Sequence, residues 1–373
     1  MENKMERIKK FCKNEIILIV SFVLAAASAF AVKPDKGYAD YIDFRTLALL
    51  FCLMTVMAGL KRMGVFRTLA QSLLKRTNTF CGLCLILCLL CFFSSMLITN
   101  DVALITFVPF SLITLRLSGK TDKMIALVTL ETVAANLGSM VTPIGNPQNL
   151  FLFSAFNMTG GEFFPKILPY GILSLVLIIV SAFFMGNEKS NIVKETSDSV
   201  KPDVKKYVLY GALFLLALLT VFRVIPYPVV LAITLVGVLI MDRKTLKKVD
   251  YSLLATFVFL FIFIGNLGRI EPVRAFLSDI ITSNEVPVGI LASQVFSNVP
   301  AAVLLAGFTK NAGDLLVGVN LGGLGTLIAS MASLISFKFI SRENISKARY
   351  LLVFTVVNVV FLAANLVLWA IIR

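Results

Sequence analysis

Long apolar stretches separated by short polar loops make up most of this chain. Most of the stretches are about 20 residues long, which is the length an α-helix needs to cross about 30 Å of hydrocarbon. Strands of a membrane barrel are only about ten residues long, so the pattern predicts helices. We expect about nine crossings, at 15–32, 43–60, 122–156, 167–185, 207–222, 228–241, 251–268, 312–336 and 346–371.

Two further apolar stretches, 79–117 and 286–309, are each interrupted near the middle by a hydroxyl-Asn pair, Thr99-Asn100 or Ser297-Asn298. We interpret each stretch as a re-entrant hairpin, which enters and leaves the membrane on the same side. A non-helical tip at membrane depth is tolerated only where it is buried in protein or lines a cavity. Both tips are therefore expected at the centre of the protein.

The polar residues around the two hairpins repeat. A serine lies five residues before each tip asparagine, an Asn-Leu-Gly sequence interrupts the crossing that follows, and a threonine lies six residues after that asparagine. The first copy comprises Ser95, Asn100, Asn136 and Thr142, and the second comprises Ser293, Asn298, Asn320 and Thr326. Duplicated polar breaks at membrane depth are typical of secondary transporters.

Composition agrees with a membrane protein, because 58% of residues are hydrophobic, 15% are charged and the mean hydropathy is +0.90. The net charge of +14 resides in short loops, which indicates orientation in the membrane rather than binding to nucleic acid. With a cytoplasmic amino terminus the hairpins enter from opposite sides, so the two repeats are inverted. The basic loops then lie inside, at 61–78, 116–123, 187–206, 242–250 and 338–349.

The predicted fold is an all-α polytopic membrane protein with inverted-topology repeats, two re-entrant hairpins and two interrupted transmembrane helices. A cytoplasmic basic leader, 1–14, precedes the first repeat, 15–186. A cytoplasmic linker, 187–206, leads to the second repeat, 207–373. We expect a multi-pass protein of the plasma membrane.

Four cysteines, Cys81, Cys84, Cys88 and Cys91, fall on one stripe of a predicted helix. The chain contains no histidine, and the residues between the cysteines are mostly apolar. We interpret the stripe as helix packing rather than metal ligation. The sequence contains no recognisable nucleophile or metal constellation, so we expect neither enzyme activity nor a cofactor.

The duplicated polar groups predict two sodium sites. A dehydrated sodium ion needs several oxygen ligands, which hydroxyls, amides and the carbonyls freed at a helix break supply. The alternative is that these residues cap helix ends and join helices, but matched spacing in two copies favours ions. The first site comprises Ser95, Thr99, Asn100 and Gly138, and the second comprises Ser293, Ser297, Asn298 and Gly322.

The segment 142–147, Thr-Pro-Ile-Gly-Asn-Pro, cannot continue a helix, because its two prolines lack N–H donors and clash with preceding carbonyls. Helix amino termini at such a break direct positive dipole ends toward the membrane midplane, which suits a small inorganic or organic anion. The predicted substrate-binding residues are Thr99, Asn100, Asp101, Thr142, Pro143, Asn146, Ser297, Asn298 and Thr326.

Asp101 and Glu131 are the main acidic residues in the predicted membrane segments, where a charge is costly and marks a functional site by default. Asp101 has Val299 as its counterpart, so it is not part of the repeat. It carries a proton, ligates a cation or forms a buried ion pair, and the sequence leaves all three open. We interpret Glu131 as a packing or gating residue.

The basic residues interpreted as interfacial anchors are Arg62, Arg67, Arg269 and Arg274.

These motifs resemble the ion transporter superfamily, which includes divalent anion:sodium symporters and arsenite and sodium–proton permeases. The likeness extends from about residue 43 to the end and rests on 99–101, 142–149 and 297–300. It implies that the tip residues bind sodium and that hairpins and broken helices slide against a scaffold in an elevator movement. The symporters carry Ser-Asn-Thr at both tips. Here the third position has no hydroxyl, and Asp101 makes the first tip more similar to the permeases.

We therefore expect a secondary transporter that couples sodium ions or protons to the movement of a small anion across the bilayer, and we expect a homodimer. Two alternatives stay open. One is a sodium–proton antiporter in which Asp101 alternates between the two cations. The other is an efflux permease for an arsenite-like oxyanion.

Overall fold

The chain is almost entirely helical in the part that the computed structural model describes, which is residues 15–66, 68, 72, 79–186 and 203–373. Among these residues, seven helices are long and apolar enough to cross a membrane, and shorter apolar helices accompany them. This confirms the expectation of an all-α polytopic membrane protein. The predicted leader, Arg67 and most of the predicted linker lie outside the described residues.

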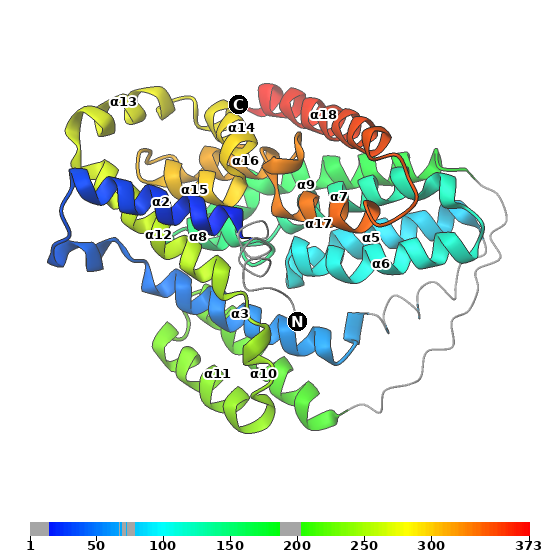
Figure 1. Ribbon diagram of the computed structural model, residues 1–373, viewed down its shortest axis with the longest axis horizontal. Helices are drawn as coiled ribbons and strands as arrows, with labels where there is room; N and C mark the ends of the chain where they lie inside the picture. Colours follow the sequence, from blue (N-terminus) through cyan, green and yellow to red (C-terminus); the bar gives the residue numbers. More distant parts are fainter. Residues whose placement is uncertain (1–14, 67, 69–71, 73–78, 187–202) are drawn as a thin grey trace, which may run out of the picture.

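One set of helices, here called the flanking group, comes from residues 15–66 and 203–281. Its elements are α2 (Ile16–Ala31), η1 (Lys36–Tyr41), α3 (Phe44–Arg62), α10 (Val204–Val221), α11 (Tyr227–Asp242), η3 (Leu246–Lys248), α12 (Tyr251–Arg269) and α13 (Glu271–Ile281). Aspartate caps start several of them: Asp43 accepts from the Thr46 N–H at 3.0 Å, and Asp250 accepts from the Leu253 N–H at 2.9 Å. Figure 1 shows α3, α10 and α11 at the bottom of the molecule.

The second set, here called the hairpin group, comes from residues 79–186 and 282–373. Its elements are α5 (Phe80–Ile98), α6 (Asn100–Leu117), η2 (Thr121–Lys123), α7 (Met124–Ser139), α8 (Pro147–Ala155), α9 (Gly160–Phe183), α14 (Glu285–Phe296), α15 (Asn298–Ala306), α16 (Ala312–Leu321), η4 (Leu327–Ala329), α17 (Met331–Ile340) and α18 (Lys347–Ile372). Most of the buried apolar side chains belong to this group, and Cys84, Cys88 and Cys91 are fully buried among them. The cysteine stripe therefore packs the core, as interpreted from the sequence.

Each predicted hairpin consists of two helices that meet at one hydroxyl residue. Thr99 joins α5 to α6 with φ 71° and ψ 152°, and Ser297 joins α14 to α15 with φ 71° and ψ 153°. Positive φ is unfavourable for residues with a Cβ, so the same uncommon conformation at equivalent positions supports the repeat. Figure 1 shows α5 and α6 in the right half and α15 in the left half, with the tips directed toward the centre.

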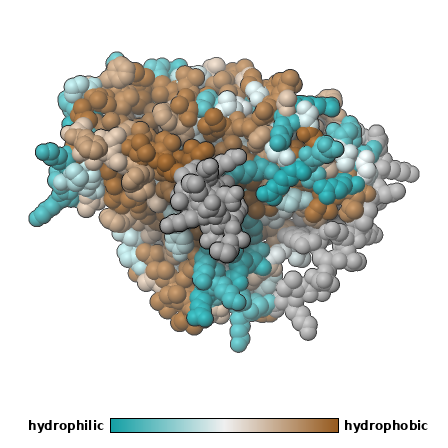
Figure 2. Space-filling model, viewed as in Figure 1, coloured by the Kyte–Doolittle hydropathy of each residue, from teal (hydrophilic) through white to brown (hydrophobic). Residues whose placement is uncertain are grey.

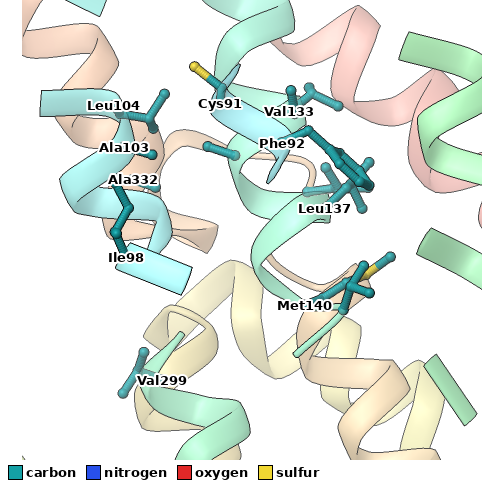
Figure 3. Close-up of a cluster of buried hydrophobic side chains, with 14 of the residues drawn as sticks. Cys91, Phe92, Ile98, Ala103, Leu104, Val133, Leu137, Met140, Val299 and Ala332 are labelled. Carbon is teal, nitrogen blue, oxygen red and sulfur yellow. The ribbon is translucent and has the colours of Figure 1, made fainter. Parts of the chain in front are cut away.

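The two predicted interrupted helices are also broken at the expected places. The first break separates α7 from α8, and the second separates α16 from α17. Close backbone packing explains the glycine near each break: a Cβ on Gly138 would lie 2.2 Å from the Phe92 carbonyl oxygen, and one on Gly322 would lie 2.5 Å from Ser293 Oγ. Each hairpin therefore packs directly against the break of its own repeat. Figure 3 shows this for the first repeat, where Phe92 lies beside Leu137.

The surface is apolar over much of the face seen in Figure 2, and hydrophilic side chains gather toward the left, right and lower edges. Exposed apolar residues occur along α9, α10, α11 and α18, among them Ile172, Leu215, Ile240 and Leu352. A soluble protein rarely exposes such continuous apolar surface. These faces are suited to contact lipid.

Candidate functional site

The first hairpin tip is held against the break between α7 and α8. Asn100 is buried, and its side-chain amide donates to Asn136 Oδ1 at 3.0 Å. The Thr142 hydroxyl donates to the Met96 carbonyl, and the buried Ser95 hydroxyl donates to the Phe92 carbonyl at 2.8 Å. These bonds fix the tip, the break and the end of α5 as one unit. Pro143 lies in the break between Thr142 and Asn146.

The second tip is buried in the same way, with Ser297 and Asn298 almost fully enclosed. Ser293 donates to the Gly289 carbonyl at 2.7 Å. Gln294, which the sequence reasoning did not select, donates to the carbonyls of Gly322 and Leu324 at 2.9 and 3.0 Å. Its Oε1 accepts the Thr326 N–H at 3.0 Å. An amide on an otherwise apolar stretch beside Ser293 was the signal that could have found it.

In the first repeat, a different residue does the work of Gln294. The Asn149 side-chain amide donates to the carbonyls of Met140 and Thr142, at 2.9 Å in both cases. Counted from Asn136 and Asn320, Met140 and Leu324 hold the same position in the two repeats. The equivalent carbonyl therefore accepts a hydrogen bond from a side-chain amide in each repeat. The amide belongs to Asn149 on α8 in the first repeat and to Gln294 on α14 in the second. Buried carbonyls at a helix break need such partners.

The two repeats exchange hydrogen bonds at the centre. Asn146 lies ten residues after Asn136, and Ser330 lies ten residues after Asn320. Asn146 donates to Asn320 Oδ1 at 3.0 Å, and Ser330 donates to Asn136 Oδ1 at 3.0 Å. Asn320 also donates to Asn149 Oδ1, at 2.7 Å. The exchange is reciprocal, so the broken helices of both repeats form a single polar centre.

A cavity of about 610 Å³ lies between the two groups of helices and reaches this centre. The predicted site residues that line it are Thr99, Asp101 and Asn146. From the flanking group it is lined by Lys61, Arg62, Lys248 and Asp250. The other predicted residues, Asn100, Thr142, Pro143, Ser297, Asn298 and Thr326, are not among its lining. The predicted site residues thus form two sets: some line the cavity, and the others lie at the tips and breaks outside its lining.

The charged residues of this region are held in different ways. Arg62 donates to Asp242 at 2.8 Å and to Thr245 at 2.7 Å, which fixes it at the end of α3 beside the cavity. Sequence reasoning missed Lys61, Lys248 and Asp250, because no local pattern says which loop meets the hairpin tip. Glu131 lies fully buried away from the cavity lining and accepts a hydrogen bond from the Ser111 hydroxyl.

The two groups of helices meet mainly through apolar side chains. The ring centroids of Phe151 on α8 and Phe261 on α12 lie 5.7 Å apart, and those of Phe153 on α8 and Phe222 after α10 lie 6.0 Å apart. Within the described ranges, side-chain hydrogen bonds and ion pairs between residues far apart in the chain stay inside one group or the other. Arg223 is the exception, because it donates to two backbone carbonyls across the boundary.

An all-α membrane protein with two broken helices around a polar cavity has the structure of a membrane transporter. The family model described as Citrate transporter matches residues 11–315. The chain belongs to this citrate transporter family, within the ion transporter superfamily. The resemblance inferred from the tip and break motifs is therefore confirmed.

Two relatives are similar to this chain over most of its length, and a third is similar over a shorter part. An uncharacterized transporter of Methanocaldococcus jannaschii is 34% identical over 325 residues, 86% of this chain and 88% of the relative. The inner membrane protein YbiR of Escherichia coli is 28% identical over 337 residues, 89% and 88% of the two chains. A silicon efflux transporter of Oryza sativa subsp. japonica is 37% identical over 142 residues, 38% of this chain and 27% of the relative. The chain is thus a multi-pass membrane transporter by family.

Proposed function

We propose that this protein is a secondary active transporter that moves a small inorganic or organic anion, coupled to sodium ions or protons, by an elevator movement. The observation that carries the proposal is the division of polar contacts. The hairpin group is tied internally by side-chain hydrogen bonds, whereas it meets the flanking group mainly through phenylalanine contacts. Surfaces without directional bonds slide at low cost, and this is how sheared domains move.

Two buried polar atoms of the polar centre support ligand binding there. Ser297 Oγ and Asn136 Nδ2 have no hydrogen-bond partner among the described residues. Buried polar groups are normally paired, so an unpaired one requires an explanation such as an ion or water. A sodium ion bound to the second tip would use the Ser297 oxygen, and an anion or water oxygen would accept from the Asn136 amide.

The cavity supports an anion as the substrate. Lys61 and Lys248 place two ammonium groups in its wall near Arg62, which is itself paired with Asp242. Basic groups in a cleft attract anions. In this proposal the Arg62 end faces the cytoplasm of a plasma-membrane protein, the amino terminus is also cytoplasmic, and the cavity is open to the inside. The assembly is a homodimer.

The first alternative, a sodium–proton antiporter, is favoured by one observation. Asp101 from the hairpin group and Asp250 from the flanking group line the same cavity. A carboxylate that faces a water-filled cavity at membrane depth is able to exchange a cation for a proton.

The second alternative, efflux of an arsenite-like oxyanion, is favoured by the amide-rich, uncharged polar centre, and relatives include a silicon efflux transporter and a putative transporter arsB.

Proteoliposomes test the proposal. Sodium-driven or proton-driven uptake of small anions is measured for the wild type, Asn100→Ala and Asn298→Ala. We expect each substitution to reduce flux by at least about tenfold. Asn100→Ala removes the buried hydrogen bond to Asn136, which costs about 1–3 kcal/mol, and Asn298→Ala removes the buried amide of the second tip. Asn358→Ala is the matched control, because Asn358 is also buried but donates within α18, to the Phe354 carbonyl at 2.8 Å. Unchanged flux and unchanged anion binding in both tip variants would contradict the proposed site.

A further inference from the structure

Within the described residues, Arg223 makes the one polar side-chain contact between residues far apart in the chain that crosses between the two groups. Its Nη1 donates to the Asn157 carbonyl at 2.9 Å, and its Nη2 donates to the Phe153 carbonyl at 3.4 Å. Arg223 follows α10 in the flanking group, and both acceptors lie at the carboxyl-terminal end of α8 in the hairpin group. Helix carboxyl termini leave carbonyls unpaired and carry partial negative charge, so a guanidinium is a favourable partner there.

The two residues joined by this contact both have positive φ. Arg223 has φ 64° and Asn157 has φ 52°, so donor and acceptor residues both lie in the left-handed region. Both residues end a helix in a common way, because the Met158 N–H bonds to the Phe153 carbonyl and the Val224 N–H bonds to the Leu219 carbonyl. The contact therefore joins the ends of two helices, and the Arg223 side chain that makes it is exposed.

A neighbouring arginine fixes the turn that carries Arg223. Arg45, at the start of α3, donates to the Thr220 and Val221 carbonyls, at 3.3 Å in both cases. This contact stays within the flanking group and holds the end of α10. The backbone that carries Arg223 is therefore held by Arg45 within the flanking group, whereas the carbonyls that accept from Arg223 belong to the hairpin group, which is proposed to move.

Helix α8 connects this contact to the polar centre. It begins at Asn146, whose side chain caps it by accepting the Asn149 N–H at 2.9 Å and also donates to Asn320. The helix has nine residues and is therefore about 14 Å long. A short helix moves as a rigid body, so a shift of its start at the site displaces the carbonyls at its end. A movement of the polar centre therefore changes the distance between Arg223 and its two acceptor carbonyls.

We propose that Arg223 is a latch, a positioning residue that holds the hairpin group in the position described here, with the cavity open at the Arg62 end. This inference rests on the proposed elevator movement. When the hairpin group slides, the two carbonyls leave the guanidinium. A second cavity, of about 500 Å³, lies beside the latch and is lined by Asn157, Arg45 and Ser154. Release of the latch separates Asn157 from Arg223 and widens this second cavity.

Hydrogen–deuterium exchange of the full-length protein in detergent tests the latch. In Arg223→Gln we expect amides at 99–102 and 331–335, beside the first cavity, to exchange at least about twofold more slowly. Amides at 154–157 and 303–307, beside the second cavity, should exchange faster. Arg223→Lys should lie between, because an ammonium keeps the charge but lacks the fork that spans two carbonyls.

Arg269→Gln is the matched control, because Arg269 is bonded to Asp35 at 2.8 Å within the flanking group. Arg269 also lies over the Tyr41 ring at the second cavity, so this control is judged at the first cavity, where exchange at 99–102 and 331–335 should be unchanged. A change confined to 153–157 in Arg223→Gln, with 99–102 unaffected, would overturn the latch and leave only a local helix cap. An equal response in Arg269→Gln would also overturn it. The proposed transport activity is judged separately, by the flux of the two tip variants, so one idea can fail without the other.

Discussion

At the scale of single residues, similar side chains serve different purposes in this protein. Asn100 and Asn136 brace the tip against the break, whereas Asp101, the next residue after Asn100, lines the cavity. Gln294 satisfies backbone groups that a broken helix leaves without partners. The tip asparagines and Asp101 could be identified from the sequence, because helix breakers and polar residues in apolar stretches are visible locally. Whether each one makes buried hydrogen bonds or lines the cavity depends on residues that are distant in the sequence but close in the fold.

Asp101→Asn distinguishes the proposed function from the antiporter. The substitution keeps the size and polarity of the side chain but removes its charge and its ability to release a proton. We expect sodium-driven anion uptake in proteoliposomes to persist with a changed pH dependence. Loss of sodium–proton exchange in the variant, with no anion flux in the wild type, would instead support the antiporter.

Gln294→Ala tests the backbone role of this residue. The substitution leaves the Gly322 and Leu324 carbonyls without this partner, and a buried group left unpaired costs about 1–3 kcal/mol. The Thr326 N–H also loses its acceptor, but it is exposed and can bond to water. We expect a lower Tm in thermal unfolding. Gln294→Glu should also destabilise, because it retains the acceptor but loses the donor. A Tm equal to that of the wild type in both variants would show that these bonds are dispensable.

At the scale of elements, each hairpin and the broken helix beside it form one unit because their backbones approach closely. Gly138 allows this in the first repeat, where it touches the Phe92 backbone, and Gly318 allows it in the second, where an added Cβ would lie 2.7 Å from the Glu285 carbonyl oxygen. The breaks were predictable from proline and glycine. The partner backbone was not, since glycine in a sequence does not say what approaches it.

Gly138→Ala measures this close contact. The added methyl group meets backbone rather than a flexible side chain, so helices α5 and α7 must separate, at a cost of about 1–3 kcal/mol. We expect a lower Tm and reduced flux. Gly211→Ala on α10 is the control, because an added Cβ there meets no atom within 4 Å, and alanine is the better helix former by about 1 kcal/mol. Equal stability of the two variants would contradict close packing at Gly138.

At the scale of the whole molecule, the fold separates what is rigid from what is free to slide. Reciprocal bonds between Asn146 and Asn320 and between Ser330 and Asn136 unite the two repeats. The boundary with the flanking group carries aromatic contacts and the single arginine. The charge pattern and the repeats predicted an inverted arrangement, but they did not predict where the boundary between the two groups runs.

Cross-linking across that boundary tests the movement. Cysteines at Phe151 and Phe261, joined by a short bifunctional reagent, should abolish flux, because the link prevents sliding. Cysteines at Phe153 and Phe163 form the matched pair, since these rings are 5.8 Å apart but both belong to the hairpin group. This second link should leave most of the flux, measured against the same variant without reagent. Full flux with the first link in place would exclude an elevator movement.

The sequence by itself determined the apolar helices, the hairpin tips and the helix breaks, because apolar length, proline and polar interruptions act on the residues next to them. It also determined the family, through the motifs at 99–101, 142–149 and 297–300. Only the tertiary structure decided that Lys61 and Lys248 line the same cavity as Asp101, that Asn146 meets Asn320, and that Arg223 reaches α8. These contacts join residues far apart in the chain, so no local pattern encodes them. They arise from how the helices pack together.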